Sequence, residues 1–261
     1  MALLFDPLFR IPLAAGLVVA LLLPLLGCYL RLRDEWLAAL GLAHVAAACH
    51  LLGAALHLPL LVSGAGGALL AVVLKQVLQR EGNGGYALMM LAGWTVLYLA
   101  AANTALGESL SHALSDGQLY FATTPQLVAL LVAGGFTLAL LPWWNRRLLR
   151  ARFFPAHEAA NRLPAWRWHL GFDLAVALLL ALATGTIGLM GAFALVFLPP
   201  WLAFRLASHW KAALAIAMAA GVAAYAAAFV LALKYDQPFG PVLVAVLLAV
   251  AALGLLRRAH H

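Results

Sequence analysis

The chain has 261 residues, of which 66% are hydrophobic and only 10% are charged, and its net charge is +7. Soluble domains are about 45–50% apolar and about 25% charged, so this composition excludes a soluble globular protein and indicates an integral membrane protein. Because one transmembrane helix takes about 20 apolar residues, the length suffices for about eight or nine crossings and little else. We therefore expect residues 1–261 to form a single all-α transmembrane domain.

Apolar runs separated by charged residues, glycine and proline predict the individual spans. In chain order the predicted spans are Pro12–Leu30, Trp36–Leu56, Pro59–Leu78, Tyr86–Leu106, Pro125–Trp144, His169–Ile187, Gly188–Phe204, Lys211–Leu233 and Phe239–Leu256. The seventh is the least regular, because it is brief, rich in glycine and contains Pro199 and Pro200. We expect it to be short or broken, and the count falls to eight spans if it turns back within the membrane.

Basic residues predict the orientation of these spans. If the N-terminus lies outside, fourteen of the sixteen Lys and Arg residues fall on the cytoplasmic side, and only Arg10 and Lys234 remain outside. This asymmetry follows the positive-inside rule, so we expect an outside N-terminus and a cytoplasmic C-terminus. The same rule accounts for the net charge, and we expect no nucleic acid partner.

The second predicted span is unusual in carrying His44, Cys49, His50 and His57. At 100° per residue His50 and His57 nearly superpose, whereas His44 lies roughly 120° away around the helix. Imidazole within a membrane suits Zn²⁺ or a similar ion and commonly faces a cavity. Each histidine is equally well explained by a hydrogen bond to a backbone carbonyl of a neighbouring helix, and Cys49 by packing as a small apolar residue.

A second group of candidate ligands lies after the fourth span, on the side predicted to be outside. Glu108, His112 and Asp116 are spaced i, i+4 and i+8, so a helix would place all three on one face. Carboxylate and imidazole together suit a divalent cation arriving at the outer mouth. The alternative is a solvated face of mixed charge with no bound ion.

The longest polar interruption, residues 145–168, connects the fifth and sixth spans. It contains six arginines and a single acid, Glu158. It also contains aromatic and turn-forming residues, including Phe153, Phe154, Pro155 and Trp166, which a segment serving only to fix topology does not need. We therefore expect this cytoplasmic loop to contact another protein.

Short motifs along the chain carry a family resemblance through their order and spacing. Their residues are Ala43 and His44; Gly117, Thr124 and Pro125; Gly188, Pro199, Ala203 and Arg205; and Tyr235, Asp236, Pro238, Gly240 and Pro241. Together they resemble the permease subunit of the zinc, manganese and iron branch of ABC importers. The resemblance extends from about Pro24 to Arg258.

The resemblance implies a role and a set of partners. The expected protein is a non-catalytic, homodimeric permease in the bacterial inner membrane, driven by a cytoplasmic ATPase dimer that binds ATP and supplied by an extracytoplasmic metal-binding protein. Membrane lipid surrounds it. The expected cargo is a divalent transition metal, with zinc first, and the expected ligands are the histidines and acids described above. The loop would carry the coupling helix within Pro155–Leu163, and its contact residues would be Pro155, His157, Glu158, Asn161 and Arg162.

Two positions depart from the family pattern. The pattern has an acid four residues before the matching histidine, and here that residue is Leu40; an acid near the start of the fourth span is replaced by Gly84 or Gly85. Losing a carboxylate removes charge compensation for a dication in a medium of low dielectric. A different metal, or a metal chelate, is therefore an alternative cargo. An intramembrane metalloenzyme that uses the same histidines is a further alternative.

Overall fold

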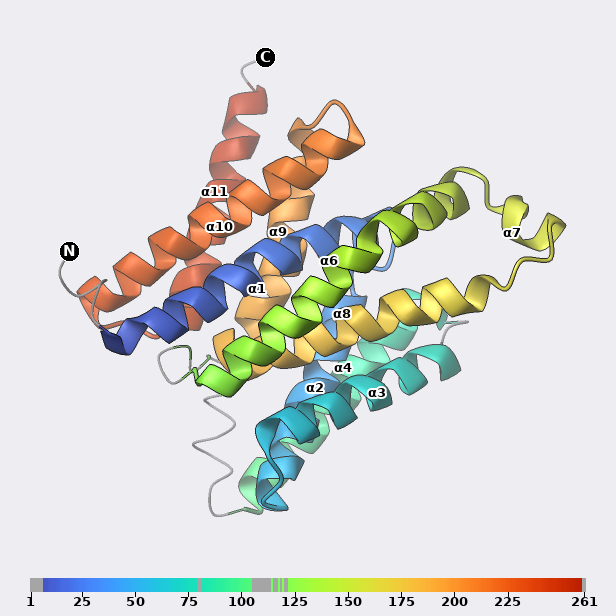
Figure 1. Cartoon of the computed structure of the whole chain (residues 1–261). Helices are drawn as coiled ribbons and strands as arrows, with labels where there is room; N and C mark the ends of the chain where they lie inside the picture. The colour runs from blue at the N-terminus through green and yellow to red at the C-terminus, as the bar shows by residue number, and fades with distance from the viewer. Residues whose placement is uncertain are drawn as a thin grey trace.

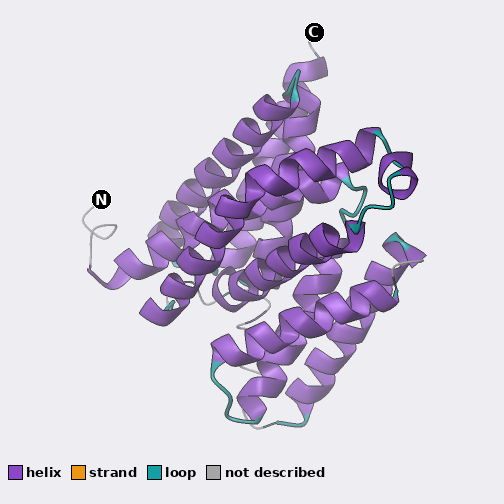
Figure 2. Cartoon of the chain, turned by 45° about the vertical axis from the view of Figure 1, so that its right-hand side comes forward, coloured by secondary structure: helices purple, strands orange, loops and turns teal. Residues whose placement is uncertain are grey.

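The computed structural model describes residues 7–78, 81–104, 114, 117, 119 and 122–259. Within these residues every regular element is a helix, and no strand is present (Figure 2). In chain order the helices are α1 (Pro7–Leu32), α2 (Ala38–Ala55), α3 (Leu60–Val77), α4 (Asn83–Ala102), α6 (Thr124–Phe153), α7 (Ala156–Ala160), α8 (Ala165–Ile187), α9 (Leu189–Leu206), α10 (Trp210–Tyr235) and α11 (Phe239–Ala259).

Eight of the described helices are long and apolar enough to cross a membrane, namely all except α7 and α11. Helix α11 has a shorter apolar stretch, Phe239–Gly254, and α7 has only five residues. The predicted fold class, an all-α integral membrane protein with eight or nine transmembrane helices, is confirmed. Figure 1 shows the N- and C-termini at different ends of the bundle.

Helix α9, the predicted short or broken span, is one short continuous helix in the structure. A single residue, Gly188, separates it from α8, with φ +83°. Glycine takes this conformation without steric cost, which allows the chain to reverse within one residue. Near one end of α9 Gly191 faces Leu243 of α11, and toward the other end Leu202 lies against Gly254, so the two helices run in the same direction.

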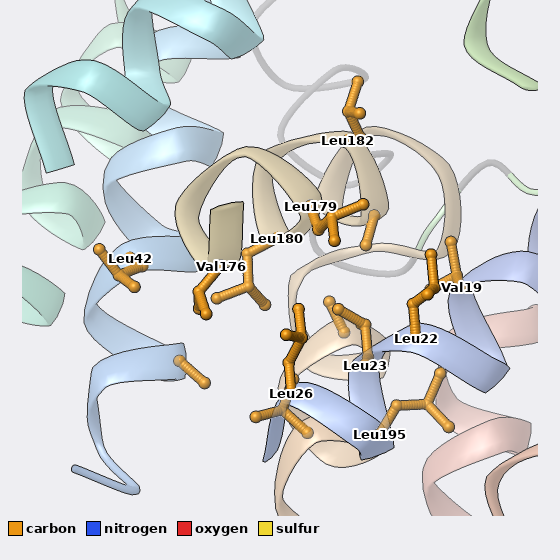
Figure 3. Packing of buried hydrophobic residues seen from close by; sticks show 14 of the residues in the cluster. Val19, Leu22, Leu23, Leu26, Leu42, Val176, Leu179, Leu180, Leu182 and Leu195 are labelled. Carbon is orange, nitrogen blue, oxygen red and sulfur yellow. The ribbon is translucent and has the colours of Figure 1, made fainter. Parts of the chain in front are cut away.

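The centre of the bundle is formed around α1, which packs against α8, α9 and α10. Leu22, Leu23 and Leu26 of α1 lie with Leu180 of α8 and Leu195 of α9 in one buried cluster (Figure 3). Lipid tails are as apolar as these side chains, so close packing rather than exclusion from water holds such helices together. The abundant alanine and glycine of this chain permit that close approach.

One end of the bundle carries most of the positive charge, and we call it the basic end. Here α1, α3, α6 and α9 finish and α8 and α10 begin, with Arg31, Lys75, Arg152, Arg167 and Arg205 among them. Asn145 of α6 connects this helix to α1 and α10 at the basic end, because its Oδ1 accepts hydrogen bonds from Tyr29 and Trp210, each at 3.0 Å. In Figure 1, α7 lies at this end, between α6 and α8.

The fifth predicted span is longer than expected. Helix α6 begins with a capping box formed by Thr123 and Gln126 and continues to Phe153 instead of ending at Trp144. The first residues of the predicted loop 145–168 are therefore helical. The reason is local: Arg and Leu are strong helix formers, and long arginine side chains extend toward water from a helix that leaves the membrane.

Candidate functional site

His44 lies on α2 and is almost entirely buried. Its Nδ1 is 2.8 Å from the carbonyl oxygen of Leu40, one turn earlier. A carbonyl only accepts hydrogen bonds, so Nδ1 carries the proton and the neutral ring keeps a lone pair on Nε2. A hydrogen bond of this kind orients histidine ligands in metal sites. The main chain of Leu40 thus orients the imidazole at the position where the family pattern has a carboxylate.

His50, on another face of α2, is held by neighbouring helices. Its Nε2 lies 2.9 Å from the carbonyl oxygen of Ala181 in α8, and its Nδ1 lies 3.3 Å from Oγ of Ser63 in α3. Gly64 and Gly185 leave room for the ring, since a Cβ at either would lie within 4 Å of it. Both ring nitrogens are engaged by protein. His50 therefore connects α2, α3 and α8, as the carbonyl explanation predicted.

Replacing His50 by leucine should reduce stability more than it changes cargo preference. The change leaves the Ala181 carbonyl without its donor in the membrane interior, where we expect a cost of about 1–3 kcal/mol. Thermal unfolding in detergent should detect this loss, whereas the order of metals transported by the surviving protein should not change. A reordered metal preference at unchanged stability would instead make His50 a ligand.

His57 does not lie on the second transmembrane helix, contrary to the prediction. Helix α2 ends at Ala55, and His57 lies in the following turn with φ +57°, exposed. The cause is Pro59, because the residue before a proline is pushed out of the α region and the helix must end earlier. His50 and His57 therefore do not superpose along one helix face.

The described residues bring together no group of three or more His, Cys, Asp and Glu side chains that could hold a metal ion. Cys49 lies beside Gly67 of α3, where it packs between the two helices. Glu108, His112 and Asp116 lie outside the described residues. Of the predicted ligands that are described and buried, only His44 has a ring nitrogen that its described hydrogen bonds leave open to an ion.

Sequence reasoning missed a buried group of charges near the basic end. Asp173 of α8 has only 2% of its side chain exposed, and it accepts from Lys75 of α3 at 2.5 Å and from Arg33 at 2.8 Å. Glu35 pairs with the same two cations, each at 3.0 Å. We call these four residues the charge cluster. The available signal was Asp173 itself, a lone acid inside an apolar span, since such a residue is usually paired.

The charge cluster and its neighbour Asp34 join several helices through one short turn, residues 33–35. Burial lowers the pKa of Arg33, but the carboxylates of Asp173 and Glu35 outweigh burial and hold that pKa above its ordinary value, so the guanidinium stays charged. Asp34, with φ +58°, points elsewhere and pairs with Arg152 of α6 at 2.7 Å. The turn after α1 therefore contacts α3, α6 and α8.

The predicted coupling segment contains the short helix α7. Glu158 on this helix is turned inward: its Oε1 accepts from the Trp168 indole at 3.0 Å, and its Oε2 lies 3.3 Å from Nε2 of His169. Because a carboxylate only accepts, Nε2 of His169 carries the proton. Both partners belong to α8, so Glu158 attaches α7 to the first turn of that transmembrane helix.

The other predicted coupling residues lie on the outer side of α7. Pro155, Asn161 and Arg162 are exposed, and Asn161 donates to the carbonyl oxygen of His157 at 2.8 Å, which closes the helix. The neighbouring aromatic side chains are also turned outward. They are Phe153, Phe154 and Trp166, each more than 60% exposed. This surface has the composition of a protein contact.

A bundle of helices long enough to cross a membrane, with the short helix α7 held outside it at the basic end, fits the permease subunit expected from the sequence. The comparison with protein families agrees: the model of the ABC 3 transport family matches residues 6–258. The chain belongs to this family. It is therefore the membrane subunit of a transporter, and the prediction of a non-catalytic permease is confirmed.

A solved structure has the same fold. PsaBC from Streptococcus pneumoniae, determined in complex with a Fab, superposes with a TM-score of 0.84 and covers 97% of this chain and 92% of its own. Sequence identity is 16%, so the likeness concerns the fold. No curated protein sequence matches the chain.

Proposed function

We propose that this permease imports a divalent transition-metal ion, with zinc as the expected cargo. The observation that carries the proposal is His44, a buried imidazole on α2 whose Nδ1 is fixed by Leu40 and whose Nε2 is left as a ligand. Neutral imidazole is the protein ligand most suited to zinc and its neighbours among the metals. Membership of the ABC 3 transport family supports a transported ion rather than a resident one.

The proposed assembly contains two copies of the chain, an ATPase dimer at the basic end and an extracytoplasmic metal-binding protein at the opposite end. The basic end then faces the cytoplasm, the N-terminus lies outside, and the positive-inside rule supports this orientation. The second copy supplies a second His44. A pathway with one described ligand per chain then offers the ion two imidazole ligands. Glu108, His112 and Asp116 are proposed to receive the ion at the outer mouth.

Movement is proposed to pass from the ATPase to His44 through α8. The ATPase contacts the outer side of α7, and Glu158 passes displacement of α7 to Trp168 and His169 at the start of α8. Farther along α8, the carbonyl of Ala181 holds His50 of α2. Helix α2 also carries His44, so α8 joins the coupling helix to the helix that holds the candidate ligand.

The cargo is tested by transport. The chain is reconstituted in liposomes with its ATPase and binding protein, and ATP-dependent uptake of zinc, manganese and iron is measured separately. Zinc uptake that saturates at the lowest concentration supports the proposal. Absence of ATP-dependent uptake for every one of these ions would contradict it.

A chelated metal is the second candidate cargo, and Leu40 is the observation that favours it. The side chain at this position packs with apolar residues of α2 and α4 and supplies no negative charge. A chelate brings its own compensating charge, so it needs fewer acidic ligands from the protein. Uptake of a zinc chelate in preference to the bare ion, in the same liposomes, would favour this candidate.

Glu158→Gln tests the coupling step. Glutamine keeps the size of the side chain but removes its charge and one acceptor oxygen. We expect the interaction of residue 158 with α8 to weaken by about 1 kcal/mol. The number of ions moved per ATP hydrolysed should then fall about fivefold. The matched control is Glu81→Gln, an exposed acid at the same end of the bundle. An unchanged ratio of transport to hydrolysis would remove Glu158 from the pathway and leave the wild-type cargo measurement unaffected.

A further inference from the structure

An apolar groove of about 490 Å³ lies between α3, α6 and α8. Its walls include Leu69 of α3, Phe136 and Leu140 of α6, and Leu174 and Leu178 of α8. Leu69 and Phe136 are both more than half exposed, so the groove borders the surface of the chain. In Figure 1, α6 and α8 run side by side over α3.

The groove has the length of half a membrane. Its residues on α6 extend from Ala133 to Trp144, which corresponds to about 16 Å at 1.5 Å per residue. The hydrocarbon of one leaflet is about 15 Å thick, half of the whole core. The end at Trp144 is the one nearer the basic end, because α6 leaves the membrane there. The groove therefore fits one acyl chain of the leaflet at the basic end.

A buried donor without an acceptor lies at this end of the groove. Trp144 has only 2% of its surface exposed, and its Nε1 has no hydrogen-bond partner in the described part of the chain. The nitrogen lies beside Gly171 of α8, where an added Cβ would be 3.8 Å away. The one other polar side chain of the groove, Thr137, is satisfied by donating to the carbonyl of Ala133 at 2.7 Å. An ester carbonyl entering beside Gly171 would supply the missing acceptor.

An unneutralised cation lies one turn farther along α6. The guanidinium of Arg147 is 3.9 Å from the ring centroid of Trp143 and 5.4 Å from that of Trp168, so it bridges α6 and α8. It donates to the carbonyl of Trp143 at 3.3 Å. None of the ion pairs among the described side chains includes Arg147. A fixed cation at the membrane surface attracts an anionic headgroup.

We propose that this groove binds an anionic phospholipid of the leaflet at the basic end. One acyl chain lies along Leu69, Phe136 and Leu178, the glycerol ester accepts from Trp144, and the phosphate lies against Arg147. The order of apolar wall, neutral donor and cation matches the order of tail, ester and phosphate in the lipid. The proposed lipid site does not depend on which ion is carried.

The test is native mass spectrometry of the full chain released from nanodiscs that contain equal amounts of phosphatidylglycerol and phosphatidylcholine. We expect the wild type to retain phosphatidylglycerol preferentially. Gly171→Leu fills the groove and should lower retention about tenfold, since each buried methylene contributes about a fourfold factor. Leu69→Trp, at an exposed position on the rim, covers the groove by a second route. Arg147→Gln should keep lipid but lose the preference for the anionic one.

Two matched variants are expected to behave like the wild type. Gly135→Leu adds the same side chain to α6 where an added Cβ meets nothing within 4 Å, and Arg150→Gln removes an exposed charge on the same helix. Millimolar inorganic phosphate should not displace the lipid. The proposal would be overturned if all variants retained lipid equally, or if the control variants lost it. It would also be overturned if the wild-type groove lost its lipid when two chains associate. The last result would assign the groove to the second copy instead.

Discussion

Replacing Asp173 by asparagine is expected to lower the free energy of unfolding by about 3–5 kcal/mol, because it leaves the buried Lys75 and the mostly buried Arg33 without their shared carboxylate. Lys75 and Asp173 have only 4% and 2% of their side chains exposed, so water cannot replace the lost charge. Glu35 can compensate only in part, since it is the more exposed of the two acids. Thermal unfolding of the purified chain in detergent, together with its yield from membranes, measures the effect.

A pair of comparison variants separates burial from charge. Asp34→Asn removes an ion pair whose two members are 70% and 48% exposed, and its expected cost is at most about 1 kcal/mol. The double change Lys75→Met with Asp173→Leu removes the buried pair as a whole and should recover most of the stability lost in the single variant. If Asp173→Asn proves no worse than Asp34→Asn, the charge cluster does not hold α8 to α3.

Replacing His44 by alanine is expected to weaken the apparent affinity for transported zinc by about 10- to 100-fold, the range found when the ligand environment of a protein metal site is damaged. His44 is the candidate whose ring is fixed through Nδ1 and left open at Nε2. Because its hydrogen bond stays within α2, its removal should not loosen neighbouring helices. The measurement is ATP-dependent zinc uptake as a function of zinc concentration in the reconstituted importer.

His57→Ala is the matched control for this experiment. The change removes an imidazole from the exposed turn between α2 and α3. A side chain there does not line a buried pathway. Zinc uptake should be unchanged in this variant, and the thermal stability of both variants should stay near that of the wild type. Equal zinc affinity in His44→Ala and the wild type would contradict the ligand assignment.

Two of the candidate residues show where prediction from sequence fails. His44 and His50 are six residues apart on the same helix, and both have apolar neighbours in the sequence. His50 nevertheless bonds Ser63 and Ala181 of other helices, whereas His44 bonds only within its own helix. Helix periodicity correctly separated their faces, but it could not say which face meets a carbonyl acceptor. That depends on α3 and α8, which lie elsewhere in the sequence.

Glu158 gives the same lesson for the coupling segment. The family resemblance implied a helix within Pro155–Leu163, and the structure has α7 there. The resemblance favoured Glu158 as a residue that contacts the partner, whereas its carboxylate bonds Trp168 and His169 of the same chain. The family pattern concerned the position of the helix and contained no information about the direction of this side chain.

The sequence by itself determined the membrane class, the all-α fold, the approximate bounds of the spans and the family, because each depends on the composition or spacing of residues close together in the chain. Twenty apolar residues need a helix in lipid wherever they are, since backbone hydrogen bonds must be made within the segment. Only the tertiary structure decided the charge cluster, in which Asp173 meets Arg33 and Lys75 from 140 and 98 residues away. Such pairs arise when helices pack side by side, and no local pattern records which helices those will be.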